Sequence, residues 1–174
     1  MTTEPISDTS QPTFEMPDYA ARTLQNMTQY IVPHFDARRV RFLEIGVQEE
    51  RSAIHAMETV CRNPDSTYLG LDKWELWADP LATSAAQVRC RETAHRNLVK
   101  YGDKARLYQG GLFDYLQQDS DPGSFDCVYI DGDHTFEACL ADSLGCWPLL
   151  ATGGVLFWDD VGVIQHRQKW QKPQ

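Results

Sequence analysis

Acidic side chains stand directly after two short apolar runs in the C-terminal third of the sequence. Asp131 follows the run FDCVYI, and the pair Asp159 and Asp160 follows the run VLFW. Apolar runs of this length without a helical period are typical of buried strands. A helix between the two runs makes the strands parallel, so that both end at the same edge of a sheet. The sequence therefore predicts three carboxylates in the crevice where open α/β sheets bind ligands, on strands about 4.8 Å apart.

The segment between these two runs has the pattern of a helix. Its apolar residues recur near helical spacing, at Phe136, Leu140, Leu144 and Trp147. We expect the TGG sequence at residues 152–154 to end this unit with C-cap chemistry. Trp147 and Trp158 are interpreted as core residues.

His134 lies three residues after Asp131, just before that helix. A histidine at this place can take up a proton near neutral pH. The alternative is that Asp133 and His134 cap the N-terminus of the helix, where Asp is favoured. For Asp159 and Asp160 the alternative is a plain polar loop.

Two earlier apolar runs also lead to residues suited to ligand contacts. The run VRFLEIGV contains Glu44 and Gly46, and the run TYLGL is followed by Asp72. A glycine in a strand–helix turn lets backbone approach a ligand closely, and an acidic residue after the second strand is suited to ribose hydroxyls. Ordinary turn chemistry for Gly46 and a solvated carboxylate for Asp72 are the alternatives. Taken together, the three residues favour a nucleoside-type ligand.

Strands and helices alternate along the chain, which is typical of a doubly wound parallel α/β sheet. Five strands are predicted, in the runs VRFLEIGV, TYLGL, ARLYQ, FDCVYI and VLFW. A helix is predicted before the first strand, at residues 19–35, and the other helices lie between strands. We divide the chain into a flexible arm at residues 1–17, one domain at residues 18–161 and a polar tail at residues 162–174.

The composition of the chain argues against some classes of binding partner. The chain has 174 residues and a formal net charge of −9, which argues against non-specific nucleic-acid binding. It has no apolar run long enough to span a bilayer and no signal-peptide pattern, so we expect no membrane partner. The five cysteines form no CxxC pair, which indicates reduced thiols in a cytoplasmic protein.

In these motifs the sequence resembles the class I S-adenosylmethionine-dependent methyltransferases. FLEIGV resembles the first motif of that family, and YLGLDKW resembles its ribose-binding second motif. The stretch YIDGDH, the helix after it and GGVLFWDDV are similar to the later motifs of metal-dependent O-methyltransferases, most of all the small-domain group of bacterial sugar and natural-product enzymes. The resemblance extends from about Arg41 to Val161. It implies a Rossmann-like fold and transfer of a methyl group from S-adenosylmethionine to a hydroxyl of a small molecule.

The resemblance also implies a role for individual residues of the cofactor site. Glu44 and Gly46 are expected near the methionine end of the cofactor, Asp72 at the ribose hydroxyls and Trp74 beside the adenine. The adenine ring is expected to be bordered by Gly110, Gly111 and Leu112. Asp131 is expected to contribute both to the cofactor site and to catalysis.

A divalent cation and a base are implied as well. Asp131, Asp159 and Asp160 match positions that hold the cation, and carboxylate oxygens suit Mg²⁺. The cation would orient the acceptor hydroxyl and lower its pKa, while His134 would take its proton. Methyl transfer is an in-line displacement, so positioning supplies most of the catalysis.

The sequence departs from the family pattern at two places. Glu50 stands where the first motif usually has a second glycine, and its side chain would crowd and repel the methionine carboxylate. The antiparallel strand pair that follows the fifth strand in the family is missing from the predicted elements, which leaves an edge strand and makes a homo-oligomer an open question. The alternative function is therefore a non-catalytic or truncated methyltransferase-fold domain acting in binding or assembly. An NAD-dependent oxidoreductase is disfavoured because GxGxxG is absent.

Overall fold

The centre of the molecule is a five-stranded parallel sheet with the strand order β3-β2-β1-β4-β5. The structure is a computed structural model that describes residues 11–14, 20–74, 84–118 and 121–159. The strands are β1 (Arg41–Ile45), β2 (Thr67–Asp72), β3 (Ala105–Gln109), β4 (Phe125–Ile130) and β5 (Leu150–Trp158). All four strand pairings are parallel, so every strand ends at the same edge. This is the Rossmann-like doubly wound sheet predicted from the sequence.

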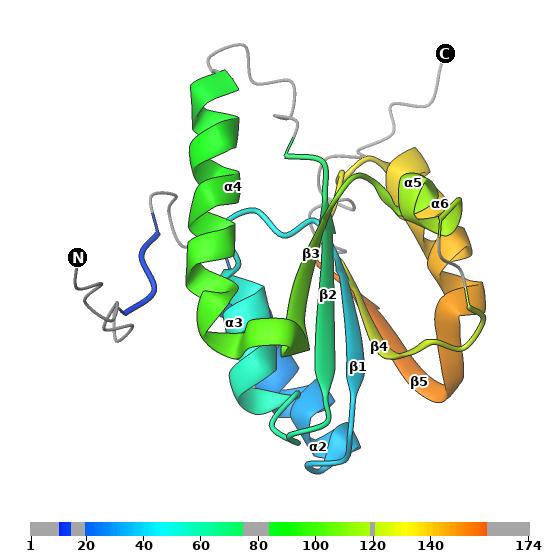
Figure 1. Ribbon diagram of the computed structural model, residues 1–174. Helices are drawn as coiled ribbons and strands as arrows, with labels where there is room; N and C mark the ends of the chain where they lie inside the picture. Colours follow the sequence, from blue (N-terminus) through cyan, green and yellow to red (C-terminus); the bar gives the residue numbers. More distant parts are fainter. Residues whose placement is uncertain (1–10, 15–19, 75–83, 119–120, 160–174) are drawn as a thin grey trace, which may run out of the picture.

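Helices cover both faces of the sheet (Figure 1). One face carries α3 (Arg51–Thr59) and α4 (Ser84–Leu98), and the other carries α5 (Leu112–Leu116) and α6 (Phe136–Cys146). The predicted N-terminal helix is present as three consecutive segments, α1 (Ala21–Asn26), the π-helical η1 (Met27–Ile31) and α2 (Val32–Phe35). Two further short helices follow α4 and α6, η2 (Val99–Lys104) and η3 (Trp147–Leu149).

Each face of the sheet has its own apolar core. On the side of α3, Phe42 of β1 and Tyr129 of β4 are buried against Met27 and Met57. On the side of α5 and α6, Leu43, Val128 and Leu112 are buried together. Alternate residues of the central strands therefore face opposite cores, as expected for a sheet covered on both faces.

The fifth strand begins earlier than predicted. β5 starts at Leu150, so the TGG sequence lies inside the strand and does not end the preceding helix. The helix ends at Cys146 and passes through the 3-10 turn of η3, which contains Pro148. The glycines are needed where the register between β4 and β5 shifts, because Gly153 has φ 79° and the pairing is irregular between Phe125 and Cys127. The two glycines therefore mark a strand irregularity, and the predicted C-cap is wrong.

The apolar stripe of α6 faces outward, which contradicts the prediction that Trp147 and Trp158 are core residues. Trp147 is 70% exposed and Trp158 is 44% exposed, and Leu144 is 66% exposed. The side of α6 that faces the sheet carries small residues. Cys146 is fully buried, and a Cβ on Gly145 would lie 2.7 Å from Leu112 Cδ2 of α5, so a larger side chain there would require Leu112 to move.

Part of the predicted N-terminal arm touches the domain. Thr13 N donates a hydrogen bond to Asn97 Oδ1 at 3.2 Å, and Asn97 Nδ2 donates to Thr13 O at 3.0 Å. The Arg51 guanidinium lies 3.9 Å from the centre of the Phe14 ring. The rest of the arm and the predicted tail lie outside the described residues.

Two further observations concern the described helices and the cysteines. None of the helices in the described part of the chain has the length and apolarity needed to cross a membrane. All five cysteines are free thiols.

Candidate active site at the carboxyl edge of the sheet

Backbone hydrogen bonds fix the residues that follow the strands along one edge. Each backbone N–H donates to the carbonyl at the end of the neighbouring strand, at 2.8 to 3.0 Å: Gly46 to Leu71, Asp131 to Ile45, Gly110 to Asp72 and Asp159 to Ile130. The predicted convergence of strand-end residues is therefore present. β4 and β5 are neighbours, as the prediction for Asp131 and Asp159 required.

Gly46 is required by the close approach of two backbone segments. Its φ is +85°, and a Cβ at this position would lie 2.1 Å from the carbonyl oxygen of Asp131 and 2.8 Å from Gly132 Cα. The glycine thus lets the turn after β1 lie against the turn after β4. Its predicted contact with a cofactor stays a prediction.

Glu44 is a fully buried acid with hydrogen-bond donors on both oxygens. Ser52 Oγ donates to Oε1, and Tyr68 OH donates to Oε2 at 2.7 Å. Burial raises the pKa of Glu44 to about 8, and the hydrogen bonds from Ser52 and Tyr68 partly oppose that rise. The carboxyl joins β1, β2 and the first turn of α3 into one rigid unit.

Asp72 holds the turn between β1 and α3. Its Oδ2 accepts hydrogen bonds from Val47 N at 2.8 Å and Gln48 N at 2.9 Å, and its Oδ1 accepts one from Trp74 N. A carboxylate has about four lone-pair positions, so little acceptor capacity remains. Asp72 is not simply a solvated strand-end residue, and its ribose contact stays a prediction.

Trp74 is buried beside this turn. It packs with Val47 and Ala94, its ring centre lies 6.2 Å from that of His95, and its Nε1 donates to Gln48 O at 3.1 Å. The side chain holds the turn in place. Only 7% of Trp74 is exposed, so little of its indole ring is accessible to a ligand. Its predicted contact with adenine stays a prediction.

The turn after β3 presents backbone. Gly110 continues the ladder to β2, and Gly111 N donates to Asp114 Oδ2 at 2.9 Å at the start of α5. Leu112, expected to border the adenine ring, is buried in the core with Leu43 and Val128. Of this predicted trio, the two glycines lie at the edge and the leucine packs inward.

Asp131 and His134 are in contact. Tyr129 OH donates to Asp131 Oδ2 at 3.0 Å, and His134 Nε2 lies 3.3 Å from Asp131 Oδ1. Burial raises the pKa of Asp131, and the charge of Asp159 raises it further, while the hydrogen bonds from His134 and Tyr129 lower it. The two residues that the sequence named for catalysis therefore lie in contact, and their catalytic roles stay predictions.

The capping alternative for Asp133 and His134 is wrong. Thr135 is the N-cap of α6, and its Oγ1 accepts a hydrogen bond from Ala138 N at 3.3 Å. Asp133 Oδ1 accepts from Thr135 N at 2.9 Å, so it shapes the turn before the helix.

Asp159 contacts the N-terminal helix. Thr23 Oγ1 of α1 donates a hydrogen bond to Asp159 Oδ1. Within the described ranges, no group of three or more His, Cys, Asp or Glu side chains is arranged to hold a metal ion. The third predicted ligand, Asp160, lies outside those ranges, so the predicted metal set is represented by Asp131 and Asp159 alone.

Glu50 occupies a position that favours glycine. It is the residue before α3, its φ is +74°, and it is 1% exposed. Gln48 in the same turn also has a positive φ, of 50°. Left-handed conformations are costly for residues with a Cβ and persist where surrounding structure enforces them. The conformation supports the interpretation that Glu50 replaces a glycine.

With the geometry of the site described, comparison with known proteins decides the family. A family profile described as a methyltransferase domain matches residues 43–161, which is more than half of the chain. The chain belongs to this methyltransferase family. No curated protein sequence matches it significantly.

Solved structures share the fold of this methyltransferase domain. A putative O-methyltransferase from Klebsiella pneumoniae has a TM-score of 0.62 and 20% identity, over 91% of this chain and 65% of that one. The O-methyltransferase TomG from Streptomyces achromogenes, involved in tomaymycin synthesis and solved with SAM, has a TM-score of 0.61 and 18% identity, over 88% and 62%. Cofactor-bound Rv0187 from MTB has a TM-score of 0.60 and 23% identity, over 83% and 58%. The chain thus spans less than two thirds of the length of these three structures.

The side chains present suit only part of S-adenosylmethionine. That cofactor carries a sulfonium and an ammonium, which the carboxyl groups of Glu50 and Asp131 complement, whereas the oxygens of Glu44 and Asp72 are largely taken by hydrogen bonds. It also carries a carboxylate, and Glu50 offers that group a buried acid where a glycine would offer space. The methyltransferase domain therefore fits the cationic part of the cofactor better than its anionic part.

Several residues of the site were missed by the sequence reasoning. Ser52, Tyr68, Tyr129 and Thr23 each donate a hydrogen bond to a predicted site carboxylate. The contact of Tyr129 with Asp131 could have been predicted from the sequence, because residues two apart in a strand point to the same side of the sheet. The other three come from separate elements, and the sequence alone does not bring them near the acids.

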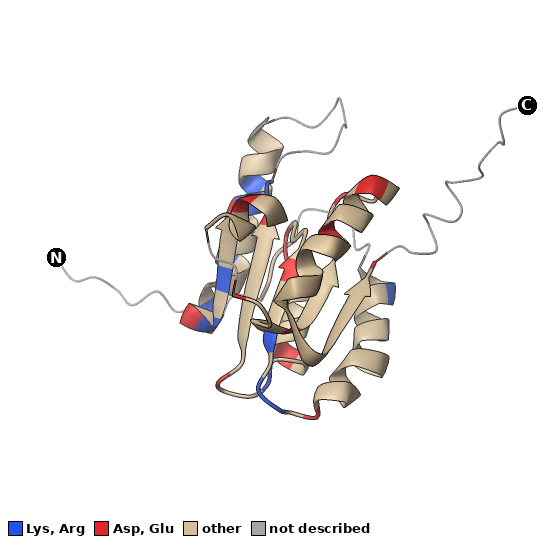
Figure 2. Cartoon of the chain, turned by 90° about the vertical axis from the view of Figure 1, so that its right-hand side faces the viewer, with Lys and Arg blue, Asp and Glu red and all other residues tan. Residues whose placement is uncertain are grey.

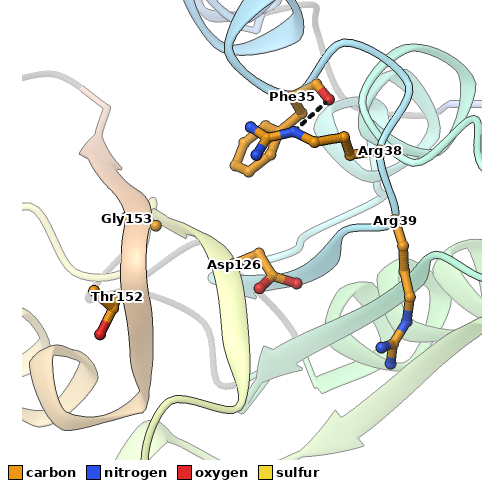
Figure 3. A pocket seen from close by; sticks show the side chains of 7 residues that line it. Phe35, Arg38, Arg39, Asp126, Thr152 and Gly153 are labelled. Atoms are coloured by element: carbon orange, nitrogen blue, oxygen red, sulfur yellow. Dashed lines mark hydrogen bonds between the residues drawn. The ribbon is translucent and has the colours of Figure 1, made fainter.

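A hollow at the opposite edge of the sheet is separate from this site. Figure 3 shows it lined by Phe35, Arg38, Arg39, Asp126 and Thr152, with neighbouring glycines of β5. Arg38 Nε donates to Phe35 O at 3.1 Å, as the dashed line in Figure 3 marks. The predicted site residues that the structure describes all lie away from its lining.

Basic and acidic residues are mixed along the elements of the described chain. In the view of Figure 2, blue and red segments are interspersed over the described part of the chain.

Proposed function

We propose that this domain is an S-adenosylmethionine-dependent methyltransferase that methylates a hydroxyl group of a small molecule. The observation that carries the proposal is the convergence of Glu44, Asp72 and Asp131 at one sheet edge, with His134 in contact with Asp131. Two of the similar structures support the cofactor, since their names give SAM for TomG and SAH for a Podospora anserina methyltransferase. A TDP-rhamnose 3'-O-methyltransferase among them supports a sugar-like or other small hydroxyl acceptor.

S-adenosylmethionine, when bound, supplies a methyl group activated by its sulfonium. His134 would accept the proton of the acceptor hydroxyl at one imidazole nitrogen, so that the oxygen can receive the methyl group that the bound cofactor would supply. Asp131 orients that imidazole through the 3.3 Å contact between Asp131 Oδ1 and His134 Nε2. Gly46 and Gly110 keep the strand-end backbone close, so the reacting groups are held by a rigid edge.

A magnesium ion is part of the proposal. Asp131 and Asp159 would hold it, together with Asp160. The proximity of the first two is supported by the charge of Asp159, which raises the pKa of Asp131. Oxygen ligands of this kind suit Mg²⁺, whose chemistry is to lower the pKa of a bound hydroxyl. The free thiols support a reducing compartment such as the cytoplasm.

A binding domain without turnover is the second candidate, and one observation favours it. Glu50 fills the glycine position of the turn after β1, and Asp72 already accepts three backbone hydrogen bonds there. A domain with these features can keep the fold while losing affinity for the cofactor.

Calorimetry of S-adenosylmethionine binding, with and without Mg²⁺, separates the two candidates. The enzyme proposal predicts measurable binding, and it predicts that Asp159→Ala abolishes the effect of Mg²⁺ while leaving cofactor affinity nearly unchanged. No binding at millimolar cofactor contradicts the enzyme proposal. Equal loss of metal effect and cofactor affinity in Asp159→Ala means that the acidic pair is structural.

A further inference from the structure

Glu50 carries a buried carboxyl group that makes no hydrogen bond within the described part of the chain. The residue is 1% exposed, and neither Oε1 nor Oε2 has a partner among the described residues. Buried polar groups in folded proteins are almost always hydrogen-bonded. A buried acid of this kind is therefore typical of a functional site, which stores strain or receives a ligand there.

Backbone hydrogen bonds hold Glu50 in its left-handed conformation at the start of α3. Glu50 N donates to Val47 O at 2.9 Å, and Glu50 O accepts from Ile54 N at 3.0 Å in the first turn of α3. The left-handed φ of +74° is therefore enforced from both sides. The carboxyl is buried and feels the charges of Glu44 on β1 and Asp72 on β2.

Among the described residues, the titratable groups that act on Glu50 or respond to it are the acids Glu44 and Asp72 and the weak acid Tyr68. The charges of Glu44 on β1 and Asp72 on β2 both act on its carboxyl, and Tyr68 on β2 is influenced by it in turn. The guanidinium of the neighbouring Arg51 lies over the Phe14 ring. Burial, helped by those two carboxylates, raises the pKa of Glu50 to about 10.

This arrangement is complementary to a positive charge. A ligand cation beside Glu50 pairs with the ionised carboxylate, and the proton that the free protein held there is released to solvent. A ligand carboxylate gains no such pair, and it meets a side chain in the space that a glycine would leave open. Glu44 cannot serve in its place, because Ser52 and Tyr68 already occupy its two oxygens.

We propose that Glu50 is a specificity residue that makes the turn after β1 prefer a ligand end bearing an amine without a carboxylate. The preferred ligand class is a sulfonium nucleoside with an alkylamine arm, such as decarboxylated S-adenosylmethionine. The inference rests on the proposed function, because it takes the same nucleoside site and changes only the end of the ligand that this turn selects.

The test is a set of calorimetric affinities for S-adenosylmethionine and its decarboxylated form. The intact chain should bind the decarboxylated form at least about tenfold more tightly, since an unpaired buried polar group costs about that factor. Glu50→Gly should lose the preference or reverse it, because it removes the acid and restores the glycine conformation. Glu50→Gln keeps the shape without the charge and should lower affinity for the decarboxylated form alone. Titrations in buffers of different ionisation enthalpy should show proton release only with the decarboxylated form and only when Glu50 is present.

The outcomes are distinguishable from failure of the proposed function. Affinity for 5'-methylthioadenosine, which has no amino-acid end, measures the nucleoside site itself and should be equal in the intact chain and Glu50→Gln. If S-adenosylmethionine binds the intact chain as tightly as the decarboxylated form and Glu50→Gly leaves the ratio unchanged, the specificity role is wrong while the methyltransferase proposal stands. If none of the three nucleosides binds the intact chain or Glu50→Gly, both proposals fall.

Discussion

Glu50 also ties the stability of the domain to pH. Its pKa rises from an ordinary value of 4.5 to about 10, so the folded chain keeps a proton that the unfolded chain releases. The stabilisation is complete below about pH 4.5 and is lost progressively as pH rises toward 10. Glu44 acts in the same direction up to about pH 8.

Replacing Glu50 should therefore flatten the pH dependence. We expect the free energy of unfolding of Glu50→Gly to exceed that of the intact chain, and the difference to grow between pH 5 and 9 by up to about 1.4 kcal/mol per pH unit. Urea unfolding at several pH values measures this. Glu50→Gln is the matched control, since it removes the titration but keeps the left-handed side chain. Parallel pH profiles for all three proteins would show that Glu50 does not titrate between the folded and unfolded states.

For individual residues, the sequence predicted the acidic side chains of the site but missed the groups that donate hydrogen bonds to them. Asp131 and His134 are three residues apart, and both local spacing and family resemblance brought them together. The donors to Glu44 come from α3 and β2, and the donor to Asp159 comes from α1. Such contacts depend on how elements pack, and no periodicity in the chain encodes them.

Among elements, the approach of the β1 and β4 turns is the tightest constraint on the site. We expect Gly46→Ala to destabilise the domain by about 2–5 kcal/mol, because it adds both a left-handed Cβ and a clash with the Asp131 carbonyl. Gly153→Ala is the matched control. Its φ of +79° is similar to the +85° of Gly46, but a Cβ there meets nothing within 4 Å among the described residues. Its cost should be only about 1–2 kcal/mol. Equal losses in urea unfolding would mean that backbone conformation alone, and not the close approach, explains Gly46.

Strands were easier to predict than the faces of helices. The run FDCVYI matched β4, a central strand whose residues are mostly buried, because a buried parallel strand needs a continuous apolar run. The mixed run ARLYQ matched β3, which is an edge strand with partly exposed residues. For α6 the spacing of the apolar residues predicted a helix correctly, but these residues face outward. The spacing of apolar residues shows that they share one face of a helix, but it does not show whether that face packs against the sheet.

For the whole molecule, that outward stripe predicts association. Leu140, Leu144 and Trp147 are 47%, 66% and 70% exposed, and Trp158 at the end of β5 is 44% exposed. β5 is the last strand of the described sheet. Exposed apolar side chains beside an edge strand favour contacts between chains. We therefore expect sedimentation velocity to show association that increases with protein concentration.

A lysine placed in the stripe should weaken that association. Leu144→Lys is the test, and Val99→Lys is its control, because Val99 is similarly exposed at 62% but lies outside α6. A lysine at residue 144 should shift the chain toward monomer, whereas one at residue 99 should not. A monomeric intact chain at every concentration, or an equal effect of the two lysines, contradicts a role for the stripe.

The central claim is that the carboxyl edge of the sheet binds S-adenosylmethionine, and amide chemical-shift mapping during a titration tests it most directly. We expect the largest shifts at residues 46–50, 72–74, 110–112 and 131–134, which follow β1, β2, β3 and β4. Largest shifts at residues 38–39 and 152–154, around the hollow at the opposite edge, or no shifts at saturating cofactor, would contradict the claim.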